Sequence, residues 1–132
     1  MEKENLKKLQ KVIENNYKWP LIVEGASADN FPTAVVLPAT ILAEELGVVG
    51  DKYPLWTMEL RIAAKGKTRP VLLIDAIDSI NETEQEKFLI ILKHRKINGF
   101  EFPKDTQIIL PVADSQKVSV EVKRYCNIYK VD

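Results

Sequence analysis

The residues best placed to do chemistry follow a short apolar run in the stretch VLLIDAID at 71–78. The apolar, partly β-branched residues Val71–Ile74 come after a proline, which predicts a central strand of a parallel sheet covered on both faces. Such strands present functional groups at their carboxyl ends, where the ligands of open α/β sheets bind. Asp75 therefore lies where a carboxylate could hold a metal ion, whereas its neighbour Ala76 has no group that could act as a general base.

Hydrophobic periodicity predicts helices and strands in alternation along the chain. Asn81 followed by Glu84 is a helix N-cap signature, and Gly47 after AEEL is typical of a helix end. Because strands that alternate with helices form parallel sheets with right-handed crossovers, we expect a three-layer α/β/α sandwich with a mainly parallel central sheet. The predicted helices are 3–17, 38–46, 82–95 and 118–124, and the predicted strands are 21–23, 55–60, 71–75, 106–112 and 127–131.

The stretch from Pro70 to Val131 resembles the second half of an AAA+ ATPase core, a branch of the P-loop NTPase superfamily. Four pieces occur in the order and with the spacing of that family. Within the family, the sequence most resembles MoxR-like and clamp-loader-type domains. The resemblance implies a P-loop NTPase-like fold. The pieces are a Walker B-like strand (VLLIDAID, 71–78), a helix running into HRKINGFEFPKDTQIIL (94–110), a sensor 1 position (PVAD, 111–114) and a short helix ending in an arginine before the last strand (VSVEVKRYCNIYKV, 118–131).

The phosphate-binding loop that this resemblance implies is degenerate. It needs close-approach glycines, a lysine and a Ser or Thr in the pattern G-x-x-x-x-G-K-[ST]. Counted from Gly25, the place of the second glycine falls on Asn30 and the place of the lysine on Phe31, and residues 19–51 contain no Lys or Arg. The candidate nucleotide-binding residues of such a loop are Gly25, Asn30 and Thr33.

A second register of the loop pattern, counted back from the AEELG helix, falls on residues 34–36 and also lacks a lysine. The segment 25–37 carries the large apolar side chains Phe31, Val35 and Val36. Because such side chains favour burial, we expect them to fill the space that phosphates would need.

Each of the remaining candidate site residues is considered for its possible roles. Asp75 is a candidate magnesium ligand or a strand-end acid that binds backbone amides, and Asp78 is expected to cap or face the following turn. At the sensor 1 position only Asp114 is polar, and a carboxylate there would repel a γ-phosphate. Arg124 matches the arginine-finger position, which implies action on a neighbour's nucleotide in trans, and a surface ion-pairing arginine is the alternative.

The resemblance also implies a helical lid after the core, and this sequence ends at Asp132 directly after the last predicted strand. We therefore expect residues 1–132 to form a single AAA+-like core domain without a lid. The Walker A lysine and the Walker B glutamate are both missing, so we expect no catalytic residues and no enzyme activity. No cofactor is expected, with ATP and Mg²⁺ as the alternative.

The composition limits the kinds of site and the cellular compartment that we expect. One cysteine, Cys126, excludes an internal disulfide and fits a reducing cytoplasm, and with one histidine, His94, it cannot build a His/Cys zinc site. No apolar stretch approaches the ~20 residues of a membrane span. The net charge is zero, from 19 basic and 19 acidic residues, with the basic excess after residue 87. We expect a cytoplasmic protein without a membrane partner.

Three functions remain open from the sequence. The leading hypothesis is a catalytically inactive AAA+-like domain that serves as a protein-binding or assembly module, with a protein partner or a homo-oligomer. The second is a nucleotide-binding protein or slow NTPase with an atypical loop at 25–37. The third is a nucleic-acid accessory protein related to replication AAA+ subunits, based on the basic excess and on those relatives.

Overall fold

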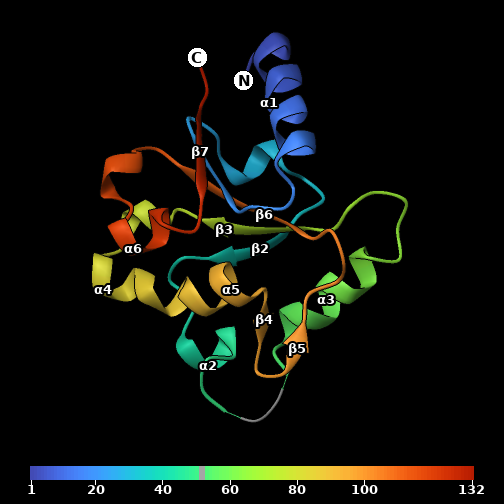
Figure 1. The fold of residues 1–132 in the computed structure, drawn as a ribbon, viewed down its shortest axis with the longest axis vertical. Coiled ribbons are helices and arrows are strands. Elements are labelled where there is room, and N and C mark those ends of the chain that lie inside the picture. Colours follow the sequence, from blue (N-terminus) through green and yellow to red (C-terminus); the bar gives the residue numbers. More distant parts are fainter. Residues whose placement is uncertain (51–52) are drawn as a thin grey trace.

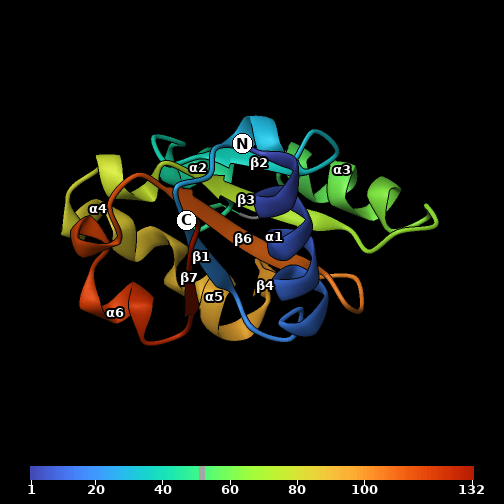
Figure 2. The same ribbon diagram turned by 90° about the horizontal axis from the view of Figure 1, so that it is seen from above.

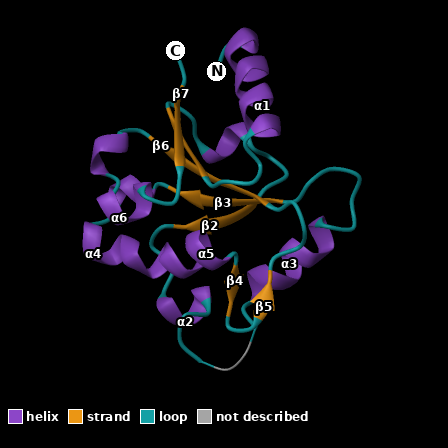
Figure 3. Ribbon diagram, viewed as in Figure 1, coloured by secondary structure: helices purple, strands orange, loops and turns teal. Residues whose placement is uncertain are grey.

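The computed structural model describes residues 1–50 and 53–132 and has a five-stranded parallel sheet at its centre (Figure 1). The strand order is β2-β3-β6-β1-β7, so β1 lies between β6 and β7, and β2 is an edge strand. A short antiparallel hairpin, β4–β5, stands apart from the sheet (Figure 3). The strands are β1 (Leu21–Glu24), β2 (Val35–Pro38), β3 (Val71–Asp75), β4 (Lys96–Ile97), β5 (Phe100–Glu101), β6 (Gln107–Val112) and β7 (Asn127–Lys130).

Helices cover both faces of the sheet, which makes the three layers that the sequence predicted (Figures 1 and 2). One face carries α1, and the other carries the remaining helices and the larger hydrophobic core. The two ends of the chain lie side by side, and the Asn5 side-chain amide donates to the main-chain carbonyl of Asp132 at 2.8 Å. The helices are α1 (Lys3–Asn15), α2 (Ala43–Leu46), α3 (Leu55–Ala63), α4 (Glu82–Gln85), α5 (Leu89–His94) and α6 (Val120–Lys123).

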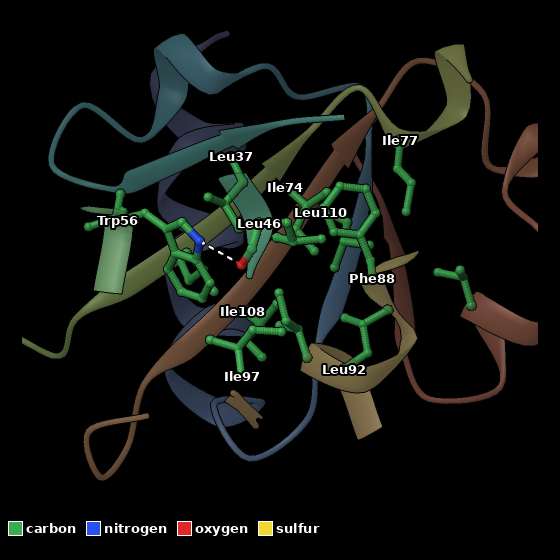
Figure 4. Packing of buried hydrophobic residues seen from close by; sticks show 14 of the residues in the cluster. Leu37, Leu46, Trp56, Ile74, Ile77, Phe88, Leu92, Ile97, Ile108 and Leu110 are labelled. Carbon is green, nitrogen blue, oxygen red and sulfur yellow. Dashed lines mark hydrogen bonds between the residues drawn. The ribbon is translucent and has the colours of Figure 1, made fainter. Parts of the chain in front are cut away.

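The larger core packs alternate residues of the central strands against the helices (Figure 4). Ile74 and Leu110 face Phe88, and all three side chains are fully buried. The indole N–H of Trp56 donates to the carbonyl of Leu46 at 3.1 Å, which satisfies a carbonyl at the end of α2 and joins this helix to α3. The strand residues alternate between faces, as a strand in a covered parallel sheet requires.

The smaller core joins α1 to the opposite face of the sheet. Leu9 of α1 is fully buried against Leu21, Val23 and Ile109. The apolar side of the helix predicted at 3–17 therefore faces the sheet, and its polar side faces outward.

Several predicted elements are confirmed by the structure. The strand predicted at 71–75 is β3, with the same bounds, and the helix before Gly47 ends there with that glycine at φ 100°. A Cβ atom at Gly47 would lie 2.4 Å from Cγ of Pro54, so the glycine is needed both for the turn and for space. Asn81 caps α4 by accepting from the N–H of Glu84 at 2.8 Å.

Three predictions of secondary structure are wrong. Residues 55–60 form helix α3 and not a strand, because Trp56 and Leu60, one helical turn apart, are the buried pair. Pro38 ends strand β2 and does not begin a helix, and β2 itself is absent from the sequence prediction. The helix predicted at 82–95 is divided by a 3-10 turn at 86–88 and ends at His94.

Candidate functional site

The carboxyl edge of the sheet is where a P-loop NTPase-like fold would bind phosphates, at the end of β1. Here β1 leads into residues 25–34, which contain a 3-10 turn at Ala28–Asn30 and no α-helix before β2 begins. A phosphate-binding loop needs a helix directly after it, because the free N–H groups and the dipole of the helix N-terminus bind the anion. In this part of the described chain that helix is missing.

Gly25 begins this loop and has a structural reason to be glycine. Its φ is 96°, a conformation that favours glycine, and its N–H donates to the carbonyl of Val112 at 2.9 Å. A Cβ atom here would lie 3.3 Å from Cβ of Val131. The conformation and the close approach of the segment after β7 therefore account for this residue without a ligand.

Asn30 and Thr33 do not form a phosphate cradle with Gly25. The side-chain oxygen Oδ1 of Asn30 accepts from the N–H of Ser27 at 3.0 Å, and the N–H of Asn30 donates to the Ser27 side chain. This capping box fixes both side chains within the loop. Thr33 is exposed in the turn before β2.

Gly25 and Asn30 line an open groove of about 880 Å³ at this edge, and Thr33 does not. The charged side chains that line the groove are all acidic. No described Lys or Arg side chain lines it, so the side chains around the groove offer no counter-charge to a triphosphate. The charged lining residues are Glu2, Asp29 and Asp132.

Of the three apolar side chains that were expected to be buried in segment 25–37, two pack against a core. Val35 is buried in the larger core, and Phe31 packs against the smaller core beside α1. Val36 is 43% exposed, so the prediction is wrong for this residue. The reason is the edge position of β2, where alternate side chains face outward.

Asp75 and Ala76 lie at the carboxyl end of β3, as the sequence predicted. The Asp75 carboxylate is half-buried and makes no hydrogen bond or ion pair with other described residues, while its main-chain carbonyl accepts from the N–H of Ala39 at 3.0 Å. Ala76 has φ 60° and ψ 40°, a left-handed conformation that costs free energy in any residue with a Cβ. The chain thus turns sharply after Asp75.

The acid that binds backbone amides is Asp78 and not Asp75. One Asp78 carboxylate oxygen accepts from the N–H groups of Ala113 and Asp114, both at 3.0 Å. These amides follow β6, at the position where the resemblance places sensor 1. The sequence predicted that Asp78 would cap or face the turn that follows β3, and its carboxylate instead caps the turn after β6.

Glu24 binds the next amide of the same turn, and it is not among the site residues predicted from the sequence. Its carboxylate accepts from the N–H of Ser115 at 2.9 Å and from the Ser115 hydroxyl at 3.0 Å, and Lys130 of β7 lies 3.4 Å away. The bond from the Ser115 N–H, then its hydroxyl and Lys130, lower the pKa of Glu24. The available signal was an acid at the end of a predicted strand.

We call residues 113–116 the amide turn. Its four N–H groups are all bound by carboxylates of the chain, since Asp114 accepts from the N–H of Gln116 at 2.9 Å in addition to the bonds of Asp78 and Glu24. Backbone N–H groups left free at this turn could bind an anion. Protein carboxylates accept all four bonds instead, and their negative charge disfavours a phosphate beside β6.

Arg124 lies on the surface just after α6. Its guanidinium is 3.3 Å from Glu121, and the two side chains are 61% and 49% exposed. The position fits the ion-pairing alternative, although an exposed pair contributes little to stability. Its assignment as an interface finger remains a prediction.

The described residues offer no metal-binding cluster and no reactive thiol. Within residues 1–50 and 53–132, no cluster of three or more His, Cys, Asp or Glu side chains could hold a metal ion. Burial raises the pKa of the Cys126 thiol to about 12, so it is protonated at neutral pH. Among the described helices, none combines the length and apolar character needed to cross a membrane.

Comparisons with solved structures identify the fold. A DNA polymerase III gamma subunit-related protein from Thermotoga maritima matches 97% of this chain with a TM-score of 0.61 and 13% sequence identity. A point mutant of RuvB from Thermotoga maritima matches 100% of it with a TM-score of 0.51 and 16% identity. In each case the match covers 46% of the solved chain. No protein-family model and no curated protein sequence matches.

Both solved proteins are AAA+ P-loop NTPases. The chain therefore has the AAA+ P-loop NTPase fold, with a mostly parallel sheet and flanking helices, as the resemblance implied. At identities this low the likeness shows the fold, and function has to be argued from the site.

Proposed function

We propose that this chain is an AAA+-fold domain that has lost its nucleotide chemistry and acts by binding another protein. One observation carries the proposal: β1 leads into residues 25–34, which form no helix before β2. Without a helix N-terminus at this place, the fold has no phosphate cradle. We keep the prediction that residues 1–132 form one core domain as part of this proposal.

The charges around the site support the same proposal. The groove beside Gly25 is lined by acids, and the amides of the amide turn are bound to Asp78, Glu24 and Asp114. Ala76 supplies no general base, which in an enzyme contributes about 10²–10⁴-fold. Even a nucleotide that bound weakly would be hydrolysed slowly.

A titration with fluorescent ATP and Mg²⁺ tests the proposal. We expect no saturable binding up to about 1 mM ligand, which corresponds to less than about 4 kcal/mol of binding free energy. Binding in the micromolar range would contradict it. The Asp75→Ala variant is the matched control, because a nucleotide site that used Asp75 as its metal ligand would lose that binding.

The solved proteins that share the fold are a DNA polymerase III gamma subunit-related protein and RuvB, which makes nucleic acid the second candidate partner. A single-stranded and a double-stranded DNA probe at low salt test this alternative. Affinity that falls steeply with salt would support it, because phosphate contacts release counterions. A protein partner alone predicts no shift with either probe.

A further inference from the structure

Helix α3 carries an apolar stripe on its outward side. Leu55, Met58 and Ile62 are 72%, 56% and 66% exposed. Their spacing of three and four residues places them on one face of the helix, opposite the buried residues Trp56 and Leu60. We call these three residues the α3 stripe. Contiguous exposed apolar side chains of this kind mark interaction surfaces.

The α3 stripe borders a groove of about 390 Å³ between α2, α3 and the edge strand β2. We call it the α2–α3 groove. Val36, Ile41, Tyr53 and Leu55 are among its apolar lining residues. It is the side of the molecule on which β2 leaves the sheet edge uncovered, with Val36 43% exposed. Leu55 belongs to both the stripe and the groove lining, whereas Met58 and Ile62 are exposed residues of α3 outside that lining.

The charged side chains that line the α2–α3 groove are acidic. Glu44 and Glu45 of α2 and Glu59 of α3 line the groove, and no described Lys or Arg does. Lys87 lies nearby, but its ammonium group donates to the carbonyl of Ile41 at 2.6 Å. An apolar groove with an acidic rim is complementary to a segment with apolar anchors and flanking cations.

We propose that the α2–α3 groove and the α3 stripe bind a basic amphipathic helix of a partner protein. The stripe runs from Leu55 to Ile62, and its ends are seven helical steps or about 10 Å apart at about 1.5 Å per residue, which matches two turns of a partner helix. Anchors at helical spacing in an apolar groove are an established way to recognise a helix. This inference rests on the proposed function and names the chemistry of its partner.

A designed peptide of about 18 residues, five helical turns, provides the probe. It carries Leu at i, i+3, i+4 and i+7 positions and Lys elsewhere, with a fluorescent label, and a matched peptide replaces every Lys with Glu. We expect fluorescence anisotropy to show saturable binding of the Leu/Lys peptide and at least about tenfold weaker binding of the Leu/Glu peptide. Equal binding of both peptides, or of neither, would overturn the proposal.

Variants locate the binding surface. Leu55→Ser with Met58→Ser should weaken binding of the Leu/Lys peptide at least about tenfold, because such anchors dominate helix binding. Val120→Ser is the control, since Val120 is 69% exposed on α6 and should leave the affinity unchanged. Equal losses in both variants would contradict the assignment of the site.

A second set of variants tests the charge on the rim. Replacing Glu44, Glu45 and Glu59 together with Gln should weaken the Leu/Lys peptide and reduce the salt dependence of its binding. Trp56 lines the groove, so its fluorescence in a Trp19→Phe background gives an independent signal of occupancy. An unchanged Trp56 signal on saturation would place the peptide elsewhere and overturn the proposal.

Sedimentation of the protein alone tests the other occupant. If the wild type is a dimer and the double variant Leu55→Ser, Met58→Ser is a monomer, a second copy of the chain covers this surface, and the proposal is overturned. The ATP titration stays independent of these results. Micromolar ATP binding with intact peptide binding would refute only the loss of nucleotide chemistry, and absent peptide binding without ATP binding would refute only this inference.

Discussion

Replacing Asp78 with alanine tests the account of the amide turn most directly. The Asp78 carboxylate accepts from two consecutive N–H groups, those of Ala113 and Asp114, both at 3.0 Å. It therefore connects the turn after β3 to the turn after β6. Removing the carboxylate leaves both amides without their partner.

The size of the effect follows from the two bonds. A hydrogen bond to a charged group contributes about 1.5–3 kcal/mol. Asp78 is half-buried and Ala113 is exposed, so water can replace part of the interaction. We therefore take the low end for each bond and expect Asp78→Ala to lower the free energy of unfolding by about 2–3 kcal/mol.

Urea denaturation followed by circular dichroism measures this loss, and Asp78→Asn is the matched control. The asparagine keeps an acceptor oxygen in the same place without the charge. Because a charge-assisted bond is roughly twice as strong as a neutral one, we expect Asp78→Asn to lose about half as much. In a thermal melt, the alanine variant should fall by about 5–12 °C for a chain of this size.

Two outcomes would contradict this role of the Asp78 carboxylate. A loss below about 0.5 kcal/mol in Asp78→Ala would mean that Asp78 behaves as an ordinary surface residue. Equal losses in the two variants would mean that the charge has no role in the turn. Mg²⁺ that raised the melting temperature of the wild type, but not of Asp78→Asn, would instead indicate a metal ligand.

Four further predictions concern single residues. Ala76→Gly should raise the free energy of unfolding by about 0.5–1 kcal/mol in urea, because the left-handed conformation costs about 1–2 kcal/mol and glycine adds flexibility to the unfolded chain; a loss would contradict the strain. Gln107→Met should raise the free energy of unfolding by about 1–2 kcal/mol, because neither polar atom of this buried side-chain amide has a partner among the described residues, and a buried unpaired group costs about 1–3 kcal/mol. A lower free energy of unfolding in urea would show that the amide makes a stabilising hydrogen bond. The lowered pKa of Glu24 means that its contribution to stability is present above its unfolded pKa of about 4.3 and is lost as the pH falls through the lower folded value; urea melts of Glu24→Gln should therefore differ most from the wild type at pH 7 and converge toward pH 2, and a constant difference would refute this. Cys126, with its pKa raised to about 12 by burial, should react with a thiol reagent at pH 8 much more slowly than the same thiol in urea, and equal rates would show that it is accessible.

The sequence determined the elements whose signals are local. The run Val71–Ile74 predicts its own strand because uninterrupted β-branched and aliphatic residues suit a covered parallel sheet. Gly47 and Asn81 set a helix end and a helix start because their backbone and side-chain chemistry acts within one turn. The order of these elements was sufficient to predict the fold class, which the structure and the comparisons confirm.

The tertiary structure decided what depends on contacts between distant segments. Residues 55–60 alternate in hydrophobicity, and only their packing, with Trp56 bonded to Leu46, makes them a helix. Strand β2 is too short to give a signal, and it exists because it pairs with β3. Short apolar segments fit a helix or a strand equally well until a neighbour is present.

The same division holds for the candidate site. The missing lysine and the alanine after Asp75 are visible in the sequence, because each is the absence of a particular chemical group. The absence of a helix after β1, and the amide turn that binds Asp78 and Glu24, are visible only in the structure. The physical reason is that a phosphate site depends on where backbone N–H groups point, and the backbone direction at a loop is set by the elements packed around it.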